Sequence, residues 1–159
     1  MADQQGGDFG RRAFLGALAV AAAAQPIGAQ GGGGRRSRGA SPPIEVNPGD
    51  KGRLAVFNFS PRPVRGTMVF MDATTGMEVP ESSIDLGVLP SRKGMYQDVI
   101  FPTSSMPPGT PNANGVDSWE IMGLFVFQGD TADVFGSVEV RRQDGTTVAH
   151  FRVEIEGVT

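Results

Sequence analysis

Short runs of alternating apolar and polar residues, each closed by turn-forming residues, dominate this chain from residue 44 onward. In a β-strand successive side chains point to opposite faces, so this alternation predicts strands that bury one face. No run in this part combines the 3.6-residue apolar period of a helix with capping residues at its ends. The pattern therefore predicts an all-β domain, a single sandwich of about 7–9 strands, with an open-ended barrel as the alternative.

The predicted strands cover residues 44–46, 53–60, 64–72, 77–79, 84–89, 95–101, 119–128, 134–142 and 146–156. The last two form the clearest hairpin, because Asp144-Gly145 lies between them and tolerates the positive φ angles of a tight turn. The run 119–128 is apolar on both faces, with Ile121, Phe125 and Phe127 on one and Met122, Leu124 and Val126 on the other. A strand buried on both sides belongs in the centre of a layered structure.

Residues 54–76 resemble a known family of domains. Leu54–Ser60, Pro63-Val64, Met68–Asp72 and the Gly76 turn give the order apolar strand, Asn-x-Ser, Pro-Val link, second apolar strand and Gly turn. This order resembles bacterial exported immunoglobulin-like or fibronectin-type domains. The resemblance implies an immunoglobulin-like sandwich and no particular activity. The cysteine framework of antibody domains is absent, and Trp119 is a candidate core anchor.

Residues 1–29 have the layout of an export signal. Arg11 and Arg12 form a positive start, residues 14–24 are apolar, and small residues lead to Ala29. A membrane-spanning helix needs roughly 20 apolar residues, about twice the length of this run, so we expect no stable membrane span. We expect cleavage after Ala29.

The order Arg11-Arg12, any residue, Phe14-Leu15 resembles the twin-arginine (Tat) export signal of bacteria. The resemblance implies that the twin-arginine translocase is a transient partner and that the chain is exported already folded. It also implies a periplasmic or secreted location.

Residues 30–43 consist largely of glycine and arginine and show no apolar period. Such a segment buries too little apolar surface to offset its chain entropy, so we predict a disordered linker and a domain at 44–159. Alternatively, Arg35, Arg36 and Arg38 tether the domain to an anionic envelope polymer or to lipid headgroups. That attraction is weak, because salt screens exposed charges within about 8 Å.

Charge and composition exclude several classes of function. Residues 41–159 carry nine basic and fifteen acidic side chains, a charge of −6 by side-chain count, and such a surface repels nucleic acid. The chain has no cysteine and one histidine, which excludes thiolate clusters and multi-histidine metal sites within one copy. We therefore expect no nucleic-acid partner, no cofactor and no metal.

His150 is the only candidate for histidine chemistry. The alternation places it on the polar face beside Arg152 and Glu154. No serine at a recognisable spacing makes His150 the base of an activated nucleophile. We interpret it as a surface histidine and predict no catalytic residue.

Acidic residues offer two further alternatives. Asp117 and the runs 112–115 and 130–133 carry oxygen ligands that calcium prefers, but their spacing differs from the twelve-residue calcium loop. We interpret them as solvated turn residues. A hydrolase would need two carboxylates converging in a cleft, and the sequence nominates no such pair.

Aromatic composition argues against a carbohydrate-binding module. The single Trp and single Tyr both lie in strand patterns, and the ten Phe are assigned mostly to the core. On 53–60, Ala55, Phe57 and Phe59 share one face, and Leu54, Val56 and Asn58 share the other.

We therefore expect an exported, non-enzymatic β-sandwich domain that acts through protein–protein or envelope contacts. The expected contact surfaces are the sheet edges at the first and last strands, through which a partner or a second copy can pair. A second surface is the Pro- and Asn-rich loop 102–116. The alternative is an accessory subunit exported together with a cofactor-bearing redox enzyme.

Overall fold

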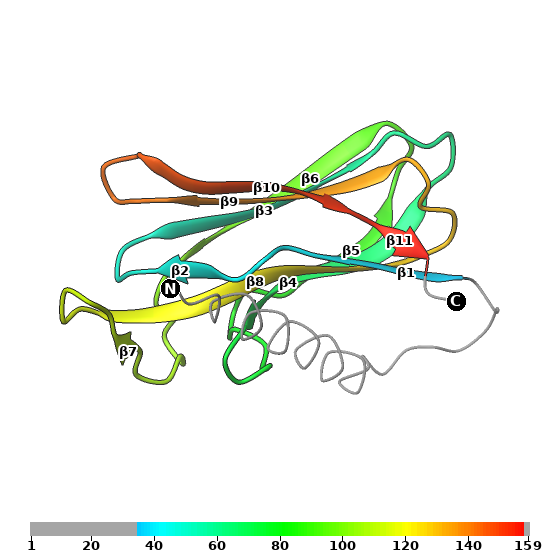
Figure 1. Cartoon of the computed structure of the whole chain (residues 1–159). Helices are drawn as coiled ribbons and strands as arrows, with labels where there is room; N and C mark the ends of the chain where they lie inside the picture. The colour runs from blue at the N-terminus through cyan, green and yellow to red at the C-terminus, as the bar shows by residue number, and fades with distance from the viewer. Residues whose placement is uncertain (1–34, 158–159) are drawn as a thin grey trace, which may run out of the picture.

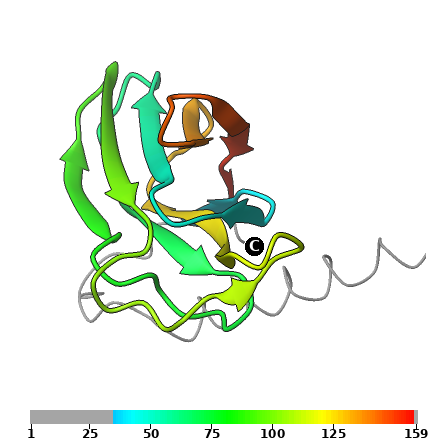
Figure 2. The same cartoon turned by 90° about the vertical axis from the view of Figure 1, so that its left-hand side faces the viewer.

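The computed structural model describes residues 35–157. The predicted signal, with Arg11, Arg12, Phe14, Leu15 and Ala29, lies outside these residues. The described part contains eleven strands and no helix, and every strand pairing in it is antiparallel. The two sheets lie one above the other (Figure 1, Figure 2). The predicted all-β sandwich is confirmed.

Seven strands form the first sheet: β1 (Arg36–Ala40), β2 (Ile44–Val46), β4 (Val64–Asp72), β5 (Ile84–Leu89), β7 (Thr110–Pro111), β8 (Asp117–Gln128) and β11 (Glu156–Gly157). Four form the second: β3 (Lys51–Asn58), β6 (Lys93–Ile100), β9 (Val134–Arg141) and β10 (Thr147–Glu154). The order is β11-β1-β8-β4-β5 in the first sheet, where β2 and β7 also pair with β8, and β10-β9-β3-β6 in the second. The predicted strand at 77–79 is reduced to an isolated bridge between Met71 and Glu78.

The core lies between the two sheets. Its fully buried side chains include Leu54 and Val56 of β3, Val138 and Val140 of β9, Met68 and Phe70 of β4, and Ile121, Phe125 and Phe127 of β8. Full burial of such a side chain contributes roughly 1.5–3 kcal/mol, so this layer is the main source of stability. Trp119 is buried in the same core, as predicted.

The predicted disordered linker at 30–43 is wrong for residues 36–40, which form β1. This strand pairs with β8 along its whole length and with β11 at Ser37 and Arg38. Buried Ser37 accepts a hydrogen bond from the Thr131 hydroxyl at 2.7 Å. Gly39 fits where a Cβ atom would lie 2.4 Å from the main-chain oxygen of Glu154. Main-chain pairing with β8 and the small size of Gly39 hold β1 in place. Neither feature gives the sequence an apolar alternation, so the strand was not predicted.

The loop 102–116 is not structureless. Residues Thr110–Pro111 form β7 on β8, and the Trp119 indole donates a hydrogen bond to the main-chain oxygen of Pro107 at 2.9 Å. Met106 packs against the core. The loop is thus attached to the end of the sandwich by both main-chain and side-chain contacts.

The predicted first and last strands lie at sheet edges: β2 pairs only with β8, and β10 and β11 each end a sheet. The last predicted strand is divided into β10 and β11, and β11 pairs with β1, so the first and last strands of the described chain hold each other. The β6 edge is more regular: all eight of its residues pair with β3 without a break in register. Within residues 35–157, no helix is long and apolar enough to cross a membrane.

Candidate functional site

The outer face of the four-stranded sheet carries the most unusual surface of the described chain. Because β3, β6, β9 and β10 alternate, one set of side chains enters the core and the other points to solvent. Register aligns the outward residues in rows across the strands. One row is Asp98, Arg53, Glu139 and His150, and another is Gly94, Phe57, Phe135 and Glu154.

Three phenylalanines form an aromatic patch at one end of this face: Phe57, Phe59 and Phe135. The Phe57 side chain is 46% exposed and Phe59 is 62% exposed. The rings of Phe57 and Phe59 are stacked with centroids 6.3 Å apart, and Phe59 lies 6.0 Å from Phe135. A Cβ atom on Gly94 would lie 2.7 Å from Phe57, so this glycine makes room for the ring. The prediction that phenylalanines mostly serve the core is wrong for this patch.

Two arginines of this face lie over aromatic rings, one of which belongs to the patch. Arg53 donates two hydrogen bonds to Asp98 at 2.7 and 2.9 Å, and its guanidinium lies 4.5 Å from the ring centre of exposed Tyr96. Arg152 lies 4.0 Å from the ring centre of Phe135. Such cation–π contacts contribute about 0.5–1 kcal/mol at exposed sites. They leave Phe57 and Phe59 as the rings of the patch without a guanidinium over them.

The ion pairs of this face shift the pKa of two carboxyl groups. Hydrogen bonding from Arg53 lowers the pKa of Asp98 and also raises the pKa of Arg53. Hydrogen bonding from Arg141 lowers the pKa of Glu139. These carboxylates are therefore held ionised, which suits recognition and leaves no proton for general acid catalysis.

His150 lies on this face, exposed as the alternation predicts, but with a neighbour that the sequence did not reveal. Its Nε2 atom is 3.0 Å from the Ser137 hydroxyl, because the β9–β10 register brings the two strands together. A serine hydroxyl next to a histidine is part of an activated nucleophile, which also needs a third group that orients the histidine. No hydrogen bond between His150 and a carboxylate occurs in the described chain, and Glu139 bonds Arg141 and Thr147 instead. The pair has no orienting group and lies on an open sheet.

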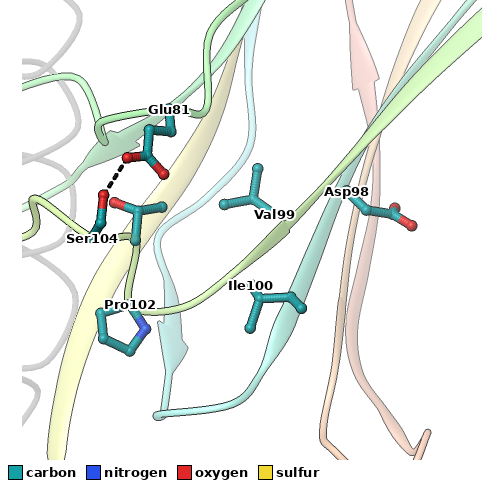
Figure 3. Close-up of a pocket in the computed structure, with 7 residues that line it drawn as sticks. Glu81, Asp98, Val99, Ile100, Pro102 and Ser104 are labelled. Atoms are coloured by element: carbon teal, nitrogen blue, oxygen red, sulfur yellow. Dashed lines mark hydrogen bonds between the residues drawn. The ribbon is translucent and has the colours of Figure 1, made fainter.

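The cavity of about 400 Å³ beside β6 contains two acids. Its lining residues are Glu81, Asp98, Val99, Ile100, Pro102, Thr103 and Ser104. Figure 3 shows that the Asp98 carboxylate points away from Glu81, whose own carboxylate accepts a hydrogen bond from the Ser104 hydroxyl. Two acids that point apart do not form the converging pair of a carboxylate hydrolase.

The candidate calcium residues serve as turn groups. The Asp130 carboxylate accepts a hydrogen bond from the Ala132 main chain at 3.2 Å, and Asn112 accepts from the main chain of Asn114 and Val116. Within residues 35–157, no group of three or more His, Asp or Glu side chains is placed to hold a metal ion.

No protein-family model matches this chain, and no curated protein or solved structure is significantly similar to it.

Proposed function

We propose that this chain is an exported, non-enzymatic β-sandwich domain that binds a protein partner of the cell envelope through the aromatic patch. The proposed export rests on Arg11, Arg12, Phe14 and Leu15, with cleavage after Ala29. The observation that carries the binding role is the exposure of Phe57 and Phe59. Both lie on or directly after β3, a central strand of its sheet, and contiguous exposed apolar side chains are typical of interaction surfaces.

A protein partner fits this surface better than a sugar. Interface centres are rich in aromatic side chains and arginine, surrounded by polar groups that exclude water. The patch has this arrangement, with Arg152 over Phe135 and the Arg152–Glu154 pair beside it. Sugar rings need open aromatic faces, but Phe57 and Phe59 are stacked on each other.

The test compares three C-terminally tagged chains expressed in the native host and recovered from its envelope. They are the parent chain, the double variant Phe57→Ser/Phe59→Ser, and the control variant Val88→Ser, which removes an exposed apolar side chain of β5. Loss of an aromatic hot spot costs about 2 kcal/mol or more, which corresponds to roughly 30-fold in affinity. We expect a partner that the parent and the control retain and the double variant loses.

Equal recovery of every bound protein by the parent and the double variant would refute the patch as the binding surface. Stoichiometric recovery of a cofactor-bearing enzyme with all three chains would instead support the accessory-subunit alternative. Mass measurement of the recovered chain shows whether it begins at Gln30, as cleavage after Ala29 requires.

A further inference from the structure

Among the edge strands of the described chain, β6 offers the longest regular edge. The edge strands β2, β7 and β11 are only two or three residues long, and β5 and β10 are each interrupted by a register shift. Strand β6 pairs with β3 at all of its residues without a shift, and it contains no proline. Short strands, bulges and prolines protect sheet edges from pairing with other chains. The β6 edge lacks all three.

The main-chain groups of alternate β6 residues point to its free side. Phe101, directly after β6, donates its main-chain N–H to the main-chain oxygen of Asp50 at 2.9 Å and accepts from Gly49 at 2.7 Å. These contacts lie on the side of β3, and successive residues of a strand turn their main-chain groups to opposite sides. The even-numbered residues of 94–100 therefore present theirs away from β3, where no other strand of the described chain pairs with β6.

Two exposed apolar side chains lie near opposite ends of this edge. Ile100 is 62% exposed at one end, and at the other Phe57 of β3 is 46% exposed beside its register partner Gly94. The Phe57 ring lies over this glycine, since a Cβ atom on Gly94 would be 2.7 Å from the ring. Because Gly94 has no side chain, a residue on a strand added beyond it can reach the ring.

We propose that β6 pairs antiparallel with β6 of a second copy about a two-fold axis, which joins the two four-stranded sheets into one. A two-fold interface is self-complementary, because each contact between two residues occurs twice. In the proposed register Gln97 faces Gln97 of the second copy at the axis, and Gly94 faces Ile100. Each Ile100 then contacts the Phe57 ring of the other copy across Gly94, and both exposed side chains are removed from water.

Charge and apolar contact select this register over its neighbours. Directly opposed residues of antiparallel strands lie on the same face of the sheet, so a two-fold pairing is centred on a single residue. A centre at Asp98 places two carboxylates opposite each other, which is unfavourable. A centre at Tyr96 leaves Ile100 opposite the turn before β6, away from Phe57. A centre at Gln97 places Asp98 opposite Tyr96 and brings Ile100 to Phe57, so no like charges meet.

This pairing goes beyond the proposed binding of an envelope partner and does not depend on it. It concerns two copies of this chain and is measured with the purified chain alone. The variants that test it leave Phe57, Phe59 and Phe135 unchanged. Failure of the pairing therefore leaves the proposed partner binding standing, and failure of the partner binding leaves the pairing standing.

The first test is sedimentation velocity of the purified full chain over a wide range of concentration. We expect a dimer whose fraction rises with concentration. In Ile100→Ser the dissociation constant should rise about tenfold or more, because the contact with Phe57 is lost twice in each dimer. The control Val148→Ser, at an exposed position of β10 on the opposite edge of the same sheet, should dimerise like the parent.

A parent chain that stays monomeric would overturn the proposal, and so would equal dissociation constants for the parent and Ile100→Ser.

The second test determines the register. The chain has no cysteine, so a single introduced cysteine forms disulfides only between copies. In Gln97→Cys the two Cα atoms lie about 4.5–5.5 Å apart, as in any directly opposed antiparallel pair, and this separation suits a disulfide. In the control Met95→Cys, on the same face, the two cysteines lie about 14 Å apart along the strands at roughly 3.4 Å per residue.

Under mild oxidation we expect Gln97→Cys to form the intermolecular disulfide about tenfold faster or more, because only its cysteines are within bonding distance. Random collision would favour the control instead, since Met95 is more exposed than Gln97. Equal rates, or faster cross-linking of Met95→Cys, would rule out the pairing centred on Gln97.

Discussion

Asn58 shows how one buried polar side chain connects distant parts of the chain. Its Nδ2 atom donates to the main-chain oxygens of Arg62 at 2.8 Å and of Leu89 and Pro90 at 3.2 Å. Its Oδ1 atom accepts from the main chain and hydroxyl of Ser60 at 3.0 and 2.7 Å. The side chain thereby joins the end of β3 to the connection between β5 and β6.

Replacement of Asn58 by an apolar residue leaves the main-chain groups that it binds without hydrogen-bond partners. We expect Asn58→Ala to lower the free energy of unfolding by about 2–3 kcal/mol, because buried groups without partners cost roughly 1–3 kcal/mol. Urea denaturation followed by tryptophan fluorescence measures the loss. The control Asn114→Ala, at an exposed turn position, should stay within about 0.5 kcal/mol of the parent. Equal losses for the two variants would contradict this role.

The sequence placed Asn58 on the same face as Leu54 and Val56, and the structure confirms that grouping. It did not indicate which face of β3 enters the core, because both faces carry apolar residues. In the structure the face with Asn58 turns inward, where the main-chain oxygens of Leu89 and Pro90, far along the chain, accept its hydrogen bonds. The aromatic patch was missed because both faces of this strand carry apolar residues. No local pattern separates an inward phenylalanine from an outward one when both faces are apolar.

Among the elements, strands with an apolar alternation were predicted well, including the three residues of β2, and the strands without one were missed. The bounds of β4 and β5 agree with the predicted 64–72 and 84–89, since alternation and flanking turns act locally. The strand β1 was missed because Arg36–Ala40 contains no large apolar residue. Its stability comes from pairing with β8, which the local sequence does not encode. The Ser137–His150 contact was missed likewise, since it depends on the β9–β10 register.

Gly39 tests whether β1 is an integral strand. A Cβ atom there would lie 2.4 Å from the Glu154 main-chain oxygen and 2.7 Å from the Val153 side chain. We expect Gly39→Val to reduce the free energy of unfolding by about 1–3 kcal/mol through overpacking. Hydrogen exchange should show faster exchange in β1 and in β11, which pairs with it. The control is Gly157→Ala, where a Cβ atom meets nothing within 4 Å. Fast exchange of residues 36–40 already in the parent chain would mean that β1 is not a stable strand.

At the scale of the whole molecule, the two sheets bury one core and present two very different outer faces. The four-stranded sheet shows charged rows and the aromatic patch to solvent, whereas the outer side of the seven-stranded sheet carries the apolar cluster of Val69, Met71, Ala73, Met122 and Leu124. The two faces are separated by the full thickness of the sandwich (Figure 1). Contacts on one face can therefore be changed without touching the other, so the proposed binding through the aromatic patch can be tested without altering the seven-stranded sheet.

The charged rows also make the stability of the molecule depend on pH. Hydrogen bonds from Arg53 and Arg141 lower the pKa of Asp98 and of Glu139 in the folded state. Groups with a lowered pKa stabilise the fold above their unfolded pKa, about 4 for carboxyl groups, and this contribution disappears as the pH falls through the folded value. Stability should therefore decrease below about pH 4 as the carboxylates of the outer face become protonated.

The variant Asp98→Asn isolates one of these groups. We expect it to be less stable than the parent at pH 7 by about 0.5–1 kcal/mol, the upper range for exposed ion pairs. The gap should close as the pH falls through the lowered pKa of Asp98, because the parent carboxyl then becomes protonated as well. Urea denaturation from pH 7 downward measures this difference in the free energy of unfolding. The stability of Arg53→Met should likewise approach that of the parent at low pH, because this variant lacks the guanidinium that lowers the pKa of Asp98. A gap that stays constant with pH would show that Asp98 contributes through packing and not through its charge.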